Sequence, residues 1–365
     1  MHTAIIGGGI AGLAAAYELE KARGAGAAVS YTLFEALPRL GGSLSSEIID
    51  GCVVEHGPDS FLTEKPAAAE LCRELGLEAD LIPSNDAARK TFVVVHNRLV
   101  PLPDGLMFLV PTKLIPTALS RLFTIRTKIR MALELLHPPR PSEGDESVAA
   151  LVERHFGAGA VDRLADPLLS GIYGGDATQL SARTVLPRLV EMESEYGSLT
   201  RGMLAAYSKM KAKAKAAGQN TKDTSGTAAQ AKPHAAPSRS IFTTLRGGQQ
   251  QLVAAIEARL DPLCVRLSTP ISALEKTATG WMVQAAGETE FYDSLIVATP
   301  AWSAAVLLAG TDEVLSEELS AIPYSSSITV NLIYDETKLG RLPDGFGFLV
   351  PASEGRAMLD RKSVV

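Results

Sequence analysis

The chain has 365 residues, enough for two domains with a sizeable core, and its 46% hydrophobic and 21% charged residues are ordinary for a soluble globular protein. Its net charge of −6 argues against a nucleic-acid partner, since general nucleic-acid binders are normally basic. The three cysteines (Cys52, Cys72 and Cys264) are far apart and lack CxxC spacing, so they suit a reducing cytoplasm and indicate neither a disulfide framework nor a metal site.

The N-terminal segment predicts a strand at Thr3–Ile6, a glycine turn, a helix over Ile10–Arg23 and a second strand at Ser30–Glu35. Its apolar start is not typical of a secretion signal, because no Lys or Arg precedes Lys21. No run of eighteen apolar residues occurs in the chain, so the sequence predicts no membrane-spanning helix.

Gly7, Gly9 and Gly12 form a GxGxxG motif between the first strand and the first helix. Gly7 permits the tight turn, Gly9 lets the backbone approach a pyrophosphate, and Gly12 lets the helix pack close to the strand. Glu35 ends the second strand at the spacing expected for an acid that binds a ribose hydroxyl. An acid there disfavours a 2′-phosphate, so the segment predicts a dinucleotide other than NADP.

The residues after Glu35 separate NAD from FAD. In EALPRLGGSLSSE, Arg39 supplies a charge for the diphosphate and the Gly41-Gly42 pair keeps the backbone open. This pattern resembles the flavin amine-oxidase superfamily, which implies FAD as the cofactor. Ser43 stands where that superfamily usually has a basic or larger residue.

Two segments leave alternatives open. Residues 106–136 are apolar with scattered cations, which favours two surface helices over a helix in a membrane interface. Residues 209–240 have seven Lys or Arg and one Asp, and almost no large apolar side chain. Such a composition predicts a disordered basic linker, and a contact of its lysines with nucleic acid or lipid is the less favoured interpretation.

Upstream, TFVVVHNRLVPLP predicts a hairpin that turns at His96-Asn97.

Four further strings resemble one branch of the superfamily. They are EHGPDSFL at 55–62, DPLLSGIYGGD at 166–176, TLRGGQQQLV at 244–253 and GFGFLVP at 345–351. In this order they are similar to the oxygen-dependent protoporphyrinogen and coproporphyrinogen III oxidases. An amine oxidase or a carotenoid desaturase would share residues 1–60 but not the strings at 170–176 and 345–351.

The resemblance implies an α/β fold with a discontinuous Rossmann-like FAD-binding domain, a β-sheet substrate domain and a helical domain. The FAD-binding domain is expected to consist of residues 1–85 and 241–305, and in the family of a final C-terminal segment as well. Between these two segments we expect a substrate-domain hairpin at 86–103, the helical domain at 104–208 and the linker at 209–240, and after them the rest of the substrate domain at 306–359. SSITVNLIYD (326–335) and GFGFLVP predict a β-rich substrate domain.

The resemblance also implies roles for particular residues. Gly57, Pro58, Asp59 and Ser60 would line the flavin, and Ile271 would offer its backbone to the adenine. Gly171 would lie over the reacting ring, Phe346 would pack on the substrate plane, and Lys90 is the cation nearest the position where some members bind a propionate. No side chain is assigned as catalytic.

The implied activity is oxidation of coproporphyrinogen III, or of protoporphyrinogen IX, to the porphyrin with O2 as acceptor and H2O2 as product. The implied partners are the porphyrinogen and O2, with a peripheral membrane contact and a contact with the next haem-pathway enzyme left open. By resemblance the family continues well beyond Leu359, and Asp360–Val365 is interpreted as a non-native tail. A non-catalytic fragment of such an enzyme is therefore an alternative.

Overall fold

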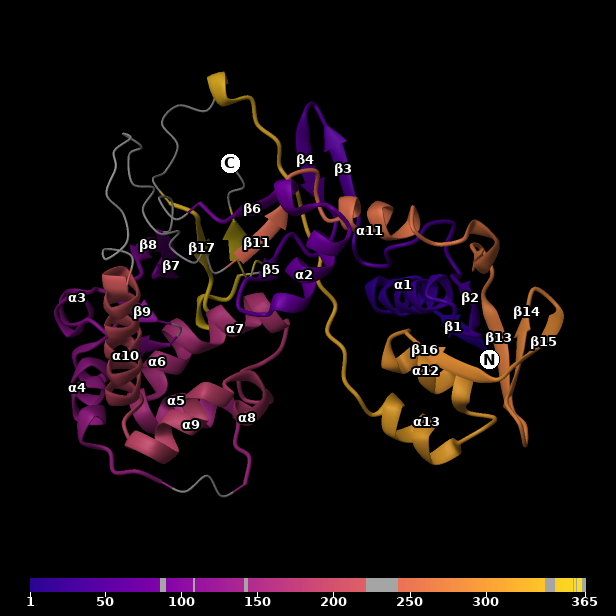
Figure 1. Cartoon of the computed structure of the whole chain (residues 1–365). Helices are drawn as coiled ribbons and strands as arrows, with labels where there is room; N and C mark the ends of the chain where they lie inside the picture. The colour runs from indigo at the N-terminus through magenta and orange to yellow at the C-terminus, as the bar shows by residue number, and fades with distance from the viewer. Residues whose placement is uncertain are drawn as a thin grey trace. The chain divides into compact units, whose positions relative to one another are not determined.

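The computed structural model describes residues 1–85, 90–107, 109–140, 144–220, 242–338, 345–356, 358 and 360–362. The chain forms two compact units (Figure 1). The first unit comprises residues 1–85, 234–324 and 328–334. The second comprises residues 86–233, 325–327 and 335–365.

The centre of the first unit is a parallel sheet in the order β12-β2-β1-β16. Its strands are β1 (His2–Ile6), β2 (Ser30–Phe34), β12 (Val265–Arg266) and β16 (Ser294–Val297). Helix α1 (Ile10–Gly24) connects β1 to β2, which confirms the predicted strand, turn, helix and strand. The carboxyl ends of parallel strands are where α/β sheets bind ligands, so this edge is the place to look for a site.

Smaller sheets and helices complete the first unit. Antiparallel strands form three groups: β3 (Ser46–Ile49) with β4 (Cys52–Glu55); β5 (Phe61–Leu62), β11 (Phe242–Leu245) and β6 (Leu81–Pro83); and β13 (Ile271–Lys276), β14 (Trp281–Ala285) and β15 (Glu288–Tyr292). The helices are α2 (Pro66–Glu74), α11 (Gln250–Glu257), α12 (Ala301–Leu308) and α13 (Glu313–Ser320). Because β11 pairs with both β5 and β6, the two halves of the discontinuous unit share one sheet.

The boundary of the first unit differs from the expected one. Residues 306–324 were expected in a substrate domain, but they group with the nucleotide-binding sheet. Helix α13 packs against α12, where Ser316 donates a hydrogen bond to the carbonyl of Ala305 and Leu319 joins the core around Tyr292. Apolar packing on this helix pair therefore extends the unit beyond residue 305.

The second unit combines a sheet with a helical bundle. The sheet has the order β18-β17-β7-β8, with β7 (Thr91–Val95), β8 (Arg98–Pro101), β17 (Gly347–Leu349) and β18 (Asp360–Lys362), and β9 (Leu106–Met107) pairs with β10 (Val110–Pro111). The helices are α3 (Leu114–Leu119), α4 (Ile125–Leu133), α5 (Val148–Phe156), α6 (Ala158–Ala160), a π-helical segment (Val161–Ala165), α7 (Asp166–Tyr173), α8 (Ala182–Val185), α9 (Pro187–Tyr196) and α10 (Leu199–Asn220). Val93 of β7 is buried in the same core as Leu151 and Phe156 of α5, so the hairpin and the helices belong to one compact unit.

The hairpin prediction is confirmed. β7 pairs with β8 in the register Val95↔Arg98, and His96 and Asn97 both have positive φ, at 48° and 63°. Two consecutive positive φ values are what a type I′ turn requires, and its twist matches that of the flanking strands.

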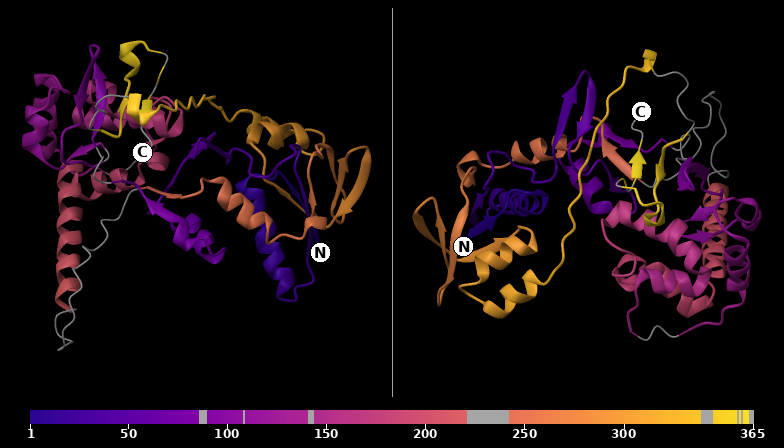
Figure 2. Two further views of the ribbon diagram at one scale, coloured as in Figure 1. Left: turned by 90° about the horizontal axis from the view of Figure 1, so that it is seen from above. Right: turned by 180° about the vertical axis from the view of Figure 1, so that it is seen from behind.

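Three other expectations differ from the structure. Helix α10 runs to Asn220, so residues 209–220 are helical and not part of a structureless linker; Ala and Lys are good helix formers. Figure 2 shows α10 standing off from the rest of its unit, and residues 221–240 of the expected linker lie outside the described residues. Residues 326–335, which were expected to be β-rich, form no strand, because no neighbouring strand pairs with them. Residues 360–362 of the expected non-native tail form β18, which pairs with β17 in the sheet.

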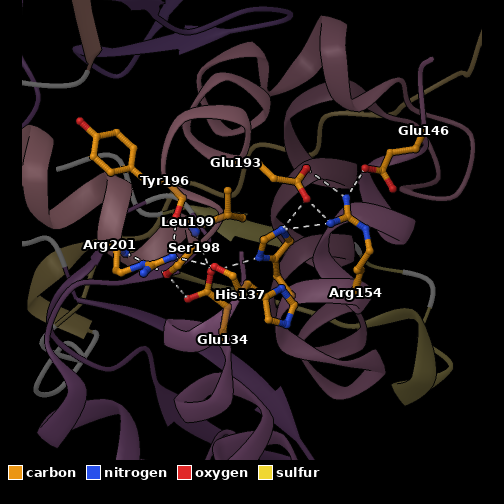
Figure 3. A network of polar contacts seen from close by, with 10 residues as sticks. Glu134, His137, Glu146, Arg154, Glu193, Tyr196, Ser198, Leu199 and Arg201 are labelled. Carbon is orange, nitrogen blue, oxygen red and sulfur yellow. Dashed lines mark hydrogen bonds and ion pairs between the residues drawn. The ribbon is translucent and has the colours of Figure 1, made fainter. Parts of the chain in front are cut away.

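A buried polar network joins four helical segments of the second unit (Figure 3). Glu134, in the 3-10 turn Glu134–Leu136 after α4, and His155 of α5 are both fully buried. His155 Nδ1 lies 3.1 Å from Glu134 Oε1, and its Nε2 lies 3.3 Å from Glu193 Oε1 on α9. At the start of α10, Ser198 and the backbone N–H of Leu199 donate to Glu134. Among the helices with described side chains, none is long and apolar enough to cross a membrane.

Candidate functional site

The glycine turn leaves an open approach to the backbone at one position. A Cβ at Gly7, whose φ is +106°, would lie 2.7 Å from the carbonyl oxygen of Ala298, and a Cβ at Gly12 would overlap the carbonyl oxygen of Gly7. Around Gly9, in contrast, a Cβ would meet no described atom within 4 Å. Gly7 and Gly12 are thus needed for the fold of the turn, whereas the absent side chain of Gly9 leaves space for a ligand.

That space lies at the N-terminus of α1. Gly9 precedes the helix in extended conformation, and no side chain caps the helix there. The first N–H groups of a helix and its dipole favour a phosphate group at this position. The turn therefore fits the pyrophosphate of a dinucleotide.

Glu35 is buried beside the turn and also shapes it. Its Oε2 accepts a hydrogen bond from the N–H of Gly8 at 2.6 Å, and its Oε1 accepts one from the N–H of Leu37 at 2.8 Å. A carboxylate has further lone pairs, so these two bonds leave capacity for a ribose hydroxyl. The backbone N–H of Thr269 also bonds to the carbonyl of Glu35, which brings the segment before Ile271 to the same edge.

We expect Glu35→Gln to weaken FAD binding about tenfold to a hundredfold, the effect of losing a charged hydrogen-bond acceptor worth about 1.5–3 kcal/mol. Glutamine is chosen because its one carbonyl oxygen can still accept from the N–H of Gly8 or of Leu37, whereas alanine would accept from neither. The measurement is quenching of FAD fluorescence on titration of apoprotein. Glu275→Gln, at an exposed position on β13 of the same unit, is the matched control. Equal affinities of the two variants would remove Glu35 as a ribose ligand.

The loop after β2 closes onto the turn. The N–H of Gly41 donates to the carbonyl of Gly8 at 2.8 Å, and a Cβ at Gly42 would lie 3.1 Å from the Cα of Gly9. Arg39 donates to the carbonyls of Leu40, Gly42 and Leu44, at 3.3, 2.8 and 3.3 Å. The guanidinium of Arg39, which is expected to contact the diphosphate, therefore also stabilises the conformation of residues 39–44.

The segment at 57–60 lies against this loop. A Cβ at Gly57 would overlap the carbonyl oxygen of Ser43, so this close approach needs glycine. The carbonyl of Asp59 accepts hydrogen bonds from Thr244 at 2.6 Å and Gln249 at 3.3 Å, while Ser60 bonds to the carboxylate of Asp59. Pro58 connects Gly57 to Asp59. The motifs at 55–62 and 244–253, far apart in the chain, are thus brought into direct contact.

The residues expected at the substrate lie in the second unit. The N–H of Phe346 donates to the carbonyl of Lys90 at 2.8 Å, because β17 runs parallel to β7 with Gly347 opposite Thr91. Phe346 is 38% exposed. Gly171 is exposed near the end of α7. The structure thus joins Phe346 to Lys90 through this backbone hydrogen bond.

Sequence reasoning missed two contributors to the site. Ala298, at the end of β16, packs its carbonyl on Gly7, and Gln249 ties the loop at Asp59 to α11. The signal for Ala298 is the apolar run that ends at Val297, since the carboxyl end of a parallel strand next to β1 must lie beside the turn. The contact of Gln249 has no local signal, because it depends on the pairing of β11 with β5.

Taken from its residues, the first unit fits FAD. Gly9 and α1 would hold the pyrophosphate, and Glu35 would bind the ribose. The backbone near Ile271 would contact the adenine. The loop at 39–43 would extend along the diphosphate, and the loop at 57–60 would line the flavin. No group of His, Cys, Asp or Glu in the described part of the chain could hold a metal ion.

Comparisons with known proteins agree with this geometry. The model of the family described as flavin containing amine oxidoreductase matches residues 10–363. The chain is 33% identical over 351 residues to the coproporphyrinogen III oxidase of Bacillus subtilis, covering 96% of this chain and 70% of the relative. It is 32% identical over 368 residues to the protoporphyrinogen oxidase of Homo sapiens, covering 97% of this chain and 71% of the relative. A crystal structure from Exiguobacterium sp. 255-15 superposes with a TM-score of 0.75 at 26% identity, covering 98% of this chain and 72% of that one.

Proposed function

The chain belongs to the flavin-containing amine oxidoreductase family and its cofactor is FAD, and from that premise we propose that it oxidises a porphyrinogen to the corresponding porphyrin. The observation that carries the proposal is the similarity, along nearly the whole chain, to coproporphyrinogen III oxidases and protoporphyrinogen oxidases.

The reaction removes six hydrogens from the tetrapyrrole. FAD, when bound, supplies the acceptor for each two-electron step. Three O2 molecules would take up the six electrons and six protons and leave as three H2O2. Aromatisation of the macrocycle favours the reaction, so the protein need only bind, orient and desolvate the substrate.

Residues of the second unit would orient the macrocycle. The ring of Phe346 would pack on its apolar face, and Gly171 would leave room for it because it has no side chain. Lys90, adjacent to Phe346 through the parallel pairing of β7 and β17, would place a cation near a propionate. A cation and a flat apolar group side by side suit a carboxylate-bearing macrocycle.

We expect coproporphyrinogen III to be the preferred substrate, with kcat/KM at least tenfold higher than for protoporphyrinogen IX. It carries four carboxylates where protoporphyrinogen has two carboxylates and two vinyl groups, so cations at the site discriminate in its favour. The measurement is porphyrin fluorescence after addition of anaerobically prepared porphyrinogens. A tenfold preference for protoporphyrinogen, about 1.4 kcal/mol of discrimination, would reverse the assignment.

A peripheral membrane contact is a further element of the proposal, and it is supported by helices α3 and α4. Ile115, Leu119 and Ile125 are 74%, 79% and 77% exposed, and Ile129 and Leu133 are also exposed. Exposed cations flank them at Lys113, Arg121, Arg126 and Arg130. Exposed apolar side chains with cations around them suit the interface of an anionic membrane.

We expect the protein to sediment with vesicles containing anionic phosphatidylglycerol and to lose most of that binding in the double variant Ile125→Glu/Ile129→Glu. The new charges would repel anionic headgroups and remove apolar contact. Ile48→Glu, at a 69% exposed position on β3, is the matched control. Vesicle binding that the double variant retains would show that another surface is responsible.

A further inference from the structure

A cavity lies on the sheet of the second unit. It has a volume of about 620 Å³, and its lining includes Val94, Arg98, Leu99, Phe348, Val350 and Arg356. The lining residues come from β7, the hairpin turn, β8, β17 and the segment that follows β17. Neither Phe346 nor Lys90 lines the cavity, so it differs from the proposed substrate contacts.

The floor of the cavity is apolar. Val94 and Val350 are buried residues of its lining, and Phe348 pairs with Phe92 across β17 and β7, so this aromatic residue is fixed by a regular parallel register. Leu99 and Met358, which are exposed, extend the apolar surface toward solvent. A flat apolar molecule can lie on such a floor.

Two guanidinium groups line the same cavity. In the part of the chain that the structure describes, Arg98 makes no ion pair, and Arg356 bonds only to the neutral side chain of Asn97. The nearby carboxylate of Glu354 is engaged by the backbone N–H groups of His96 and Asn97. The two positive charges are therefore left without a carboxylate partner among the described residues.

From this juxtaposition we infer that the cavity binds the carboxylate-bearing edge of a porphyrin, with Arg98 and Arg356 pairing with two propionates and Phe348 packing against the macrocycle. The volume lies in the range of small-molecule sites, and arginine is the side chain best suited to pair with carboxylates. The identity of the ligand as a tetrapyrrole rests on the proposed function. The cavity would then hold the porphyrin product through residues other than the proposed substrate contacts Lys90, Phe346 and Gly171.

The test measures binding of coproporphyrin III to the FAD-loaded protein by fluorescence anisotropy. We expect Arg98→Gln/Arg356→Gln to raise the Kd at least tenfold, and Leu99→Glu to raise it as well by placing a negative charge in the lining of the cavity. Arg140→Gln, an exposed arginine of the same unit outside the cavity, should bind like the parent protein. If Arg356→Gln disturbs the hairpin through Asn97, Arg98→Gln alone and Leu99→Glu still decide the result.

A Gly171→Trp variant separates this site from the reaction. It should abolish porphyrinogen turnover and leave arginine-dependent porphyrin binding in place. Porphyrin binding that is lost in Gly171→Trp but kept in the arginine variant would overturn the inference and leave the proposed function standing. If the parent protein binds porphyrin through the arginines but does not turn over porphyrinogen, the proposed function would be overturned and the inference would stand. Equal competition by oleate would assign the cavity to carboxylate amphiphiles in general and would also overturn the inference.

Discussion

Replacing Glu134 with alanine should lower the free energy of unfolding of the second unit by about 3–5 kcal/mol, the usual cost of removing one partner of a buried ion pair. The carboxylate is fully buried and serves His155, Ser198 and the N–H of Leu199 together. Alanine would leave all three without an acceptor, and the start of α10 would lose its attachment to α4 and α5.

Hydrogen exchange measured by mass spectrometry is the suitable readout. Both tryptophans, Trp281 and Trp302, belong to the first unit, so intrinsic tryptophan fluorescence would report on the wrong unit. Peptides from α5 and the first turns of α10 should exchange faster in the variant, while those from β1 and α1 should not change. Glu146→Ala is the control, because Glu146 contacts Arg154 in the same network but its side chain is 37% exposed. A variant as stable as this control would show that the network is dispensable.

The stabilising effect of Glu134 should disappear in acid. Burial alone would raise the pKa of Glu134, but hydrogen bonds from His155 and Ser198 outweigh burial and lower it. The pKa of Glu193 is also lowered, because the hydrogen bond and the charge of Arg154 outweigh its burial. A carboxylate with a lowered pKa stabilises the fold above its unfolded pKa, about 4.3, and loses that effect as the pH falls through the folded value. The difference between parent and Glu134→Gln should therefore shrink below about pH 4.

Gly9→Val should abolish FAD binding, lowering the affinity at least a hundredfold, and leave the first unit folded. A Cβ at this position would meet no described atom within 4 Å, so we expect the change to cost the apoprotein little, but valine would fill the space where the pyrophosphate approaches α1. The purified protein should be colourless, with a thermal unfolding midpoint of the apoprotein within a few degrees of the parent value.

Variants at two further glycines of the same segment serve as controls for this experiment. Gly24→Val lies at the end of α1, where a Cβ also meets no described atom within 4 Å, and should keep its FAD. Gly12→Val should instead fail to fold, because its Cβ would overlap the carbonyl of Gly7. Normal flavin content in Gly9→Val would refute the assignment of the turn to the pyrophosphate.

The local elements of the fold could be predicted from the sequence. The strand, turn and helix around Gly7 and the hairpin at His96-Asn97 follow from short-range rules, since glycines at fixed spacing and a two-residue turn determine the backbone over a few residues. Glu35 could be placed beside the turn because its spacing from Gly12 depends only on one helix and one strand, and its role as ribose ligand stays a prediction.

The remaining features depend on contacts between distant residues. The burial of Glu134 beside His155 has no periodic signal, because it requires α4, α5, α9 and α10 to meet. The grouping of α13 with the first unit depends on packing against α12. The extension of α10 reflects helix propensity in a segment whose composition indicates disorder, and over residues 209–220 propensity prevails.

The order of the central sheet has a consequence for synthesis of the protein. Thr3 of β1 pairs with Ser294 of β16, so one edge of the first strand stays open until residue 294 has been made. At about 5–20 residues per second, roughly 15–60 s separate the two strands as they leave the ribosome. During that interval an apolar strand with unpaired backbone groups is exposed, and such edges pair readily with other chains. Nascent chains of this protein should therefore depend on a chaperone that covers the first strand, more than a domain built from one continuous segment would.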